Sequence, residues 1–118
     1  MLYNINEDCW DDELLNIFNI NKNILPDVKN CADDFGAIDS SFFGEKISIG
    51  GVAGDQQAAT IGQACFKEGM VKSTYGTGCF LLMNTGNKFI ESESKLLSTK
   101  AYNIFDKRDF ALEGSIFN

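Results

Sequence analysis

Apolar residues recur at helical spacing in two parts of the chain. The first part predicts a helix over residues 11–20, where Leu14 and Phe18 share one face. The second predicts a helix over residues 55–68, for which Gly69 is a natural stop because glycine adopts the left-handed conformation easily. Both helices are short and amphipathic, so each needs another element to cover its apolar face.

Short apolar runs bounded by glycine and charged residues predict strands elsewhere in the chain. The predicted strands cover residues 47–52, 71–75, 79–83, 96–105 and 109–117. Gly76-Thr77-Gly78 is the turn of the first hairpin, and Asp106-Lys107-Arg108 is a charged turn between the last two strands. An extended connection is expected to start at residues 25–28, and residues 30–46 read as loop and short strand, with turns at Gly36 and Gly44.

The bulk composition is that of a soluble globular protein, 44% hydrophobic and 23% charged. A chain of 118 residues makes one ordinary domain or a segment of something larger. A net charge of −7 argues against nucleic acid and anionic membrane as partners. No apolar run approaches the ~18 residues that span a bilayer. The N-terminal residues show no signal-peptide pattern, so a cytoplasmic location is expected.

The chemistry open to the chain is limited by its residue types. Four cysteines stand at positions 9, 31, 65 and 79, without a Cys-x-x-Cys pair, and histidine is absent. Clustered zinc ligands are therefore missing, and free thiols are expected under cytosolic conditions. Acid–base chemistry must come from carboxylates, lysine or tyrosine.

Nine of the eleven glycines fall between Gly44 and Gly86, and they frame one carboxylate. That carboxylate is Asp55 in the run Gly50-Gly51-Val52-Ala53-Gly54-Asp55-Gln56-Gln57-Ala58-Ala59. Its position between a strand and a helix suits a helix N-cap. The same position, at the carboxyl end of a strand, also suits a general base. The residues alone leave both interpretations open.

The turn Gly76-Thr77-Gly78 also has two interpretations. It is a glycine-rich hairpin turn, and consecutive backbone N–H groups in such a turn can form an anion site. It is neither a Walker P-loop nor a dinucleotide fingerprint, because no Gly-Lys-Ser/Thr follows and position 81 is leucine. Phe80 is by pattern a core aromatic residue on a strand.

The run around Asp55 and Thr74-Tyr75-Gly76-Thr77-Gly78-Cys79-Phe80, in this order, closely resemble the glycerol kinases of the FGGY carbohydrate kinase family. The resemblance covers nearly the whole chain and continues in Ala111-Leu112-Glu113-Gly114-Ser115-Ile116-Phe117. It departs at Ser48, where the family usually has proline, and over residues 101–107, where it usually has a Cys-Gly-Pro-type turn.

The resemblance implies an α/β chain that is a fragment of the actin-like ATPase (ribonuclease H-like) fold. Residues 1–66 would be the end of the first domain, with its last strand and helix. Residues 67–118 would be the start of the second domain, with its opening β-hairpins.

The resemblance also implies roles for six residues. Asp55 would be the catalytic base and would bind substrate, together with Gln56 and Phe80, which would contact glycerol. The turn of Gly76, Thr77 and Gly78 would bind nucleotide. The implied cofactor is ATP with Mg²⁺, the metal being held through the phosphates near Asp55 without a directly assigned protein ligand.

Two function hypotheses follow for the chain. It is part of an ATP-dependent glycerol kinase, inactive alone because the first phosphate loop and most glycerol and adenosine contacts are missing. Alternatively, it is a non-catalytic remnant or small interaction module of a decayed kinase gene. Its partners would be the missing kinase segments or a second copy, and apolar surface is expected beside Val52, Ile61, Leu81 and Ile116.

Overall fold

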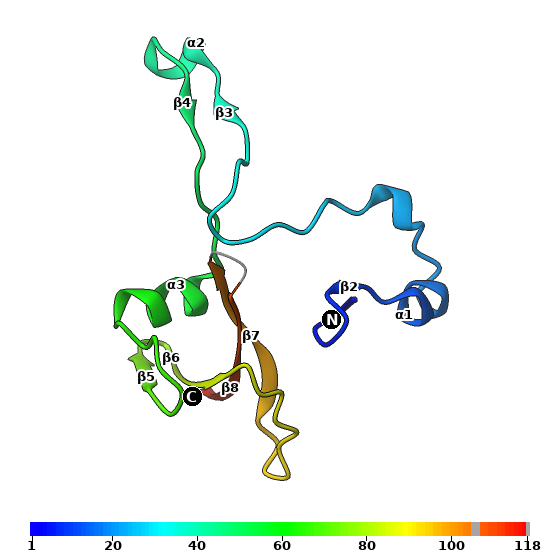
Figure 1. The fold of residues 1–118 in the computed structure, drawn as a ribbon, viewed down its shortest axis with the longest axis vertical. Coiled ribbons are helices and arrows are strands. Elements are labelled where there is room, and N and C mark those ends of the chain that lie inside the picture. Colours follow the sequence, from blue (N-terminus) through cyan, green and yellow to red (C-terminus); the bar gives the residue numbers. More distant parts are fainter. Residues whose placement is uncertain (105–106, 118) are drawn as a thin grey trace.

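The computed structural model describes residues 1–104 and 107–117 as an open arrangement of helices and strands (Figure 1). The Cα radius of gyration is 16.5 Å. A compact domain of this length would have a radius of about 13.5 Å. The chain therefore extends well beyond a compact globule.

The order of elements along the chain is as follows. The helices are α1 (Asp12–Ile17), α2 (Ser40–Phe43), α3 (Asp55–Gly62) and the short 3-10 helix Lys22–Ile24. The strands are β1 (Tyr3–Asn4), β2 (Cys9–Trp10), β3 (Ala37–Ile38), β4 (Ile47–Ser48), β5 (Val71–Tyr75), β6 (Gly78–Gly86), β7 (Leu97–Ile104) and β8 (Lys107–Phe117). In the described residues no helix combines the length and the apolar character needed to cross a membrane.

The second half forms a four-stranded antiparallel sheet in the order β5-β6-β8-β7. The predicted hairpin is confirmed, but its turn is one residue shorter than the predicted Gly76-Thr77-Gly78, because Gly78 is the first residue of β6. The predicted charged turn is wrong for Lys107 and Arg108, which pair with Ile104 and Asn103 inside the β7–β8 ladder. Backbone pairing thus continues through these charged residues. The other predicted turn residue, Asp106, lies outside the described residues, as does residue 105 at the end of the predicted strand.

The first predicted helix is confirmed but is shorter than expected. The Asp11 side chain accepts a hydrogen bond from the backbone N–H of Leu14 at 2.9 Å, which caps the start of α1. The end is set at Asn19, which has a φ of 53°. The N–H of Ile20 then donates to the carbonyl of Leu15, so a Schellman motif ends the helix before residue 20.

The second predicted helix is also shorter, because it ends at Gly62 instead of residue 68. Ala64 has a φ of 57°, and the N–H of Cys65 donates to the carbonyl of Thr60 at 3.0 Å. This is the same terminating motif, with alanine in the left-handed position where glycine is usual. Gly69 does have positive φ, but it lies in a later turn and does not end the helix.

The predicted strand over residues 47–52 is mostly wrong. Only Ile47–Ser48 is a strand, and it pairs with β3 in a hairpin that projects from the body (Figure 1). Beyond it, Gly51 makes one isolated bridge to Ala32. Among the described residues, residues 47–52 pair only with the two residues of β3 and with Ala32, so most of the stretch does not form a strand.

The core lies where α3 packs on the sheet. Leu82, Ala101, Tyr102 and Ala111 form the buried cluster, and Ile61 of α3 packs against it. Apolar side chains elsewhere are exposed, among them three of the four residues named above: Val52, Leu81 and Ile116. The sheet therefore has a covered region under α3 and apolar positions that no described element covers.

Candidate functional site

Asp55 is the first residue of α3, and its side chain is exposed. The N-cap is Gly54, which has an extended conformation and offers no side chain to the helix. The interpretation of Asp55 as the N-cap is therefore wrong by one position. Its Oδ1 accepts the backbone N–H of Gln56 at 2.8 Å, which leaves the second carboxylate oxygen without a role in the helix start.

Gly54 makes room for a contact that holds the start of α3 against the sheet. A Cβ at this position would lie 2.6 Å from Oε1 of Gln57. The Gln57 Nε2 donates to the carbonyl of Lys100 on β7 at 3.3 Å. The glycine before Asp55 thus allows the Gln57 side chain to fold back, and the carboxylate is presented from an anchored helix end.

Gln56 points in a different direction, toward β5. Its Oε1 accepts a hydrogen bond from Nζ of Lys72, a residue with only 1% of its surface exposed. The same Nζ donates to Oγ1 of Thr74 at 3.2 Å and to the carbonyl of Phe80 at 3.5 Å. Thr74 and Phe80 are cross-strand partners in the β5–β6 hairpin. Lys72 thereby joins the two predicted substrate-contacting residues, Gln56 and Phe80.

The segment Gly76-Thr77-Gly78 connects the two strands of this hairpin. The Gly76 N–H donates to the carbonyl of Gly78 at 2.9 Å, so this one N–H is used within the turn and is not offered to an anion. A Cβ on Gly78 would lie 2.9 Å from Cε2 of Phe80. This glycine is therefore required for the Phe80 ring to lie against the turn, while Thr77 is exposed between the two glycines.

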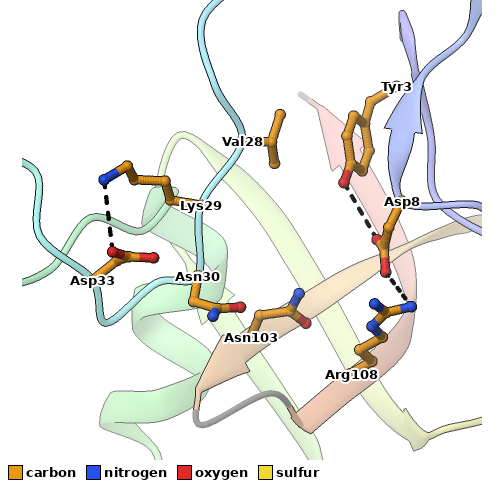
Figure 2. Close-up of a pocket in the computed structure, with 8 residues that line it drawn as sticks. All are labelled: Tyr3, Asp8, Val28, Lys29, Asn30, Asp33, Asn103 and Arg108. Atoms are coloured by element: carbon orange, nitrogen blue, oxygen red, sulfur yellow. Dashed lines mark hydrogen bonds and ion pairs between the residues drawn. The ribbon is translucent and has the colours of Figure 1, made fainter.

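A polar pocket of about 400 Å³ lies elsewhere, between the N-terminal segment and the β7–β8 hairpin (Figure 2). Asp8, which lines the pocket together with Arg108, forms an ion pair with Arg108 at 2.9 Å and a second one, with Lys100 of β7, at 2.8 Å. Burial raises the pKa of Tyr3, and the Asp8 carboxylate raises it further. None of the six predicted site residues lines this pocket. Its charges tie the N-terminal segment to the sheet.

The site contains a proton acceptor (Asp55), an amide (Gln56) and an aromatic ring (Phe80). Among the described residues, no group of three or more acidic or cysteine side chains lies close enough to hold a metal ion.

Sequence reasoning missed Lys72 and Thr74. The signal was present in the alternation along β5, because Lys72 lies opposite Leu82 and Thr74 opposite Phe80. A lysine on the apolar side of a predicted hairpin is unusual unless it is paired. The sequence does not show which face of the hairpin is buried, because this depends on the packing of α3 against β5.

The N-terminal domain of the FGGY family of carbohydrate kinases matches residues 1–62, more than half of the chain. The chain belongs to the FGGY family of carbohydrate kinases. It is 61% identical over 117 residues to the glycerol kinase of Rhizobium meliloti (strain 1021), covering 99% of this chain and 24% of that relative. It is 59% identical over 116 residues to the glycerol kinase of Gluconobacter oxydans (strain 621H), covering 98% and 23%.

The FGGY fold is confirmed by a solved structure as well. A crystal structure of Plasmodium falciparum glycerol kinase with ADP matches with a TM-score of 0.91 and 47% identity. The match covers 98% of this chain and 24% of that one. The chain therefore has the fold of a glycerol kinase segment and spans about a quarter of the length of the relatives that it matches. The predicted family and the fragment of an actin-like fold are both confirmed.

Proposed function

We propose that this chain is a segment of an ATP-dependent glycerol kinase, and that Asp55 is the catalytic base of that enzyme. The observation that carries the proposal is the arrangement around α3. The Asp55 carboxylate is exposed, and one of its oxygens is not used by the helix. The next residue, Gln56, accepts a hydrogen bond from Lys72, which also donates to the Phe80 carbonyl. A proton acceptor next to an amide and an aromatic ring suits a small polyol.

In the proposed reaction, Asp55 accepts the proton of one glycerol hydroxyl as its oxygen attacks the γ-phosphorus of ATP. The bond between that phosphorus and the β–γ bridging oxygen breaks, and the products are glycerol 3-phosphate and ADP. Gln56 hydrogen-bonds the polyol, and the Phe80 ring forms an apolar wall for its carbon atoms. Catalysis of this kind depends on positioning and on charge stabilisation of the transferring group.

The nucleotide is assigned to the turn formed by Gly76, Thr77 and Gly78. The exposed Thr77 hydroxyl offers a hydrogen bond to a phosphate oxygen, and the turn backbone can approach closely because both neighbours are glycine. Mg²⁺, when bound with ATP, would neutralise phosphate charge near Asp55.

Residues 1–66 and 67–118 are proposed as parts of two domains. The match of the family's N-terminal domain to residues 1–62 supports a boundary close to Phe66. The exposed side chains of Val52, Leu81 and Ile116 favour contact with the remaining kinase segments or with a second copy. We place the enzyme in the cytoplasm, where the free thiols of its four cysteines would persist.

The first prediction concerns activity of the segment alone and in a complete enzyme. The purified 118 residues are expected to show no glycerol-dependent ATP turnover. When the same residues replace the matching quarter of the Rhizobium meliloti glycerol kinase, turnover is expected to return. A coupled ADP assay measures both.

An inactive but folded chimaera would contradict the proposed function. It would favour the second candidate, a non-catalytic remnant whose site residues have survived. Robust turnover by the isolated segment, lost in Asp55→Asn, would overturn the requirement for the missing parts.

A second prediction addresses the turn. In the active chimaera, Thr77→Val is expected to raise the KM for ATP about three- to tenfold, because it removes one hydroxyl beside the phosphates. The KM for glycerol should stay within about twofold of the parent value. Thr77→Ser restores the hydroxyl and should restore the ATP KM. Equal effects of valine and serine would show that the hydroxyl is not used.

A further inference from the structure

Lys72 is a buried cation that the proposed chemistry leaves unused. It is the second residue of β5, on the side that faces α3, and 1% of its surface is exposed. Burying a charged group is costly unless its hydrogen bonds are satisfied. A lysine in this place therefore needs a specific arrangement of acceptors.

Its ammonium group has three donors, and the structure supplies three acceptors. They are Oε1 of Gln56, Oγ1 of Thr74 and the backbone carbonyl of Phe80. All three are uncharged. In the described part of the chain, no carboxylate lies within ion-pair distance of Lys72. Lys72 is thus not half of a salt bridge. Its hydrogen bonds are directed at the residues around the site.

This arrangement fixes the orientation of the Gln56 carboxamide. An amide group carries an acceptor oxygen and a donor nitrogen on opposite branches. A lysine ammonium only donates, so it holds Oε1 and excludes the flipped orientation. The Nε2 group then points away from Lys72 as a donor. The Gln56 backbone is held as well, since its carbonyl accepts the buried hydroxyl of Thr60 at 2.8 Å.

We propose that Lys72 is a positioning residue that locks Gln56 so that its Nε2 donates to a hydroxyl oxygen of the polyol substrate. Thr74 and the Phe80 carbonyl hold the lysine in place. Because one ammonium contacts both Gln56 and the Phe80 backbone, it also sets the spacing between the amide and the aromatic residue. Substrate specificity at this point comes from a donor of fixed direction and not from a freely rotating amide.

The kinetic test uses Lys72→Met in the active chimaera, since methionine keeps the unbranched chain and removes the donors. The KM for glycerol is expected to rise about tenfold, as for the loss of one oriented hydrogen bond. The kcat should stay within about threefold, and the KM for ATP should not change. Lys88→Met, at an exposed lysine paired with Glu68, is the matched control and should change neither KM.

A double-mutant cycle separates positioning from general packing. In a Gln56→Ala background, Lys72→Met should cause a much smaller rise in the glycerol KM, because the amide it orients is gone and only its contact with the Phe80 carbonyl remains. Additive effects would show that Lys72 acts independently of Gln56, and would overturn the proposal. So would a parallel loss of kcat and of ATP affinity.

Gln56→Glu provides a test that leaves the buried lysine intact. A glutamate at 56 can still pair with Lys72 but has no N–H to donate, so the KM for glycerol should rise about tenfold in a well-folded protein. If Gln56→Glu retains the parent KM, the donor assignment is wrong.

The role of Lys72 rests on the proposed function, so one measurement is made without turnover. In the folded chimaera labelled with ¹⁵N at glutamine side chains, the Gln56 Nε2 group should show a high NMR order parameter, which should fall in Lys72→Met. An unchanged order parameter of the Gln56 side chain overturns the locking itself. A locked amide in an inactive chimaera contradicts only the kinase assignment.

Discussion

Replacing Asp55 by asparagine in the active chimaera is expected to lower kcat about 10²–10⁴-fold with little change in the glycerol KM. Asparagine has nearly the same size, and its Oδ1 can still accept the Gln56 N–H that Asp55 accepts at 2.8 Å. Because Asp55 is exposed at the start of α3, the substitution should not disturb packing. What is lost is the proton acceptor, so the loss should fall on the chemical step. Steady-state kinetics at saturating ATP measures kcat and KM separately.

The matched control is Asp39→Asn. Asp39 also lies at the start of a helix and also accepts a backbone N–H, that of Ser41 at 2.8 Å. This hydrogen bond lowers the pKa of Asp39. Asp39 lies between β3 and α2, in the hairpin that projects away from α3 (Figure 1). Asp39→Asn should leave kcat unchanged. If Asp55→Asn behaved in the same way, Asp55 would serve only the local structure of the helix, and the base would have to be sought elsewhere.

The hairpin sheet was predictable because its signals are local. The turn glycines at 76 and 78 and the alternating residues beside them determine where β5 ends and β6 begins, and the observed pairing of Tyr75 with Cys79 matches that pattern. The order β5-β6-β8-β7 was not predictable in the same way. It requires β8 to pair with β6 as well as with its neighbour β7, a contact that no turn sequence specifies.

The helix ends were missed because the residues that end them are not glycine. Asn19 and Ala64 both adopt positive φ and close a Schellman motif. Asparagine tolerates this conformation, so Asn19 carried a weak signal, but alanine carries none. At Ala64 the hydrogen bond from Cys65 to Thr60 and the burial of Cys65 favour a conformation that alanine would otherwise avoid.

The candidate site was found by family resemblance and not by spacing. Asp55 and Gln56 are adjacent, yet the structure sends their side chains to different places, one to solvent and one to Lys72. Lys72 is 16 residues away from Gln56, and its burial depends on α3 covering β5. Alternation along a strand identifies which residues share a face, but it does not say which face is covered. For this reason the positioning residue was visible only in the folded chain.

The largest effect on stability is expected at Asn84, which is fully buried at the end of β6. Its Nδ2 donates to the carbonyl of Cys65 at 2.9 Å, and its Oδ1 accepts the N–H of Gly86 at 2.7 Å. One side chain thus satisfies two backbone groups, one in the connection after α3 and one at the irregularity in the β6–β8 ladder. The Tyr102 hydroxyl lies 3.4 Å from the same Nδ2, and burial raises the pKa of Tyr102, with the Asp109 charge raising it further. The phenol is therefore protonated at neutral pH and remains part of the network.

Asn84→Leu keeps the branched shape and the number of heavy atoms of asparagine. It leaves the Gly86 N–H without its partner and the Cys65 carbonyl with only the longer hydrogen bond from the Tyr102 hydroxyl, at 3.5 Å. Because an unpaired buried group costs about 1–3 kcal/mol and the second group is weakened as well, the substitution should destabilise this region by about 1–4 kcal/mol. The measurement is native-state hydrogen exchange of the β6 and β8 amides in the full-length chimaera, which reports local opening free energies. Asn87→Leu, at an exposed asparagine just beyond β6, is the control and should shift exchange by less than about 0.5 kcal/mol. If both variants exchange alike, water or a shifted backbone satisfies the two groups, and Asn84 does not hold the connection after α3 to the sheet.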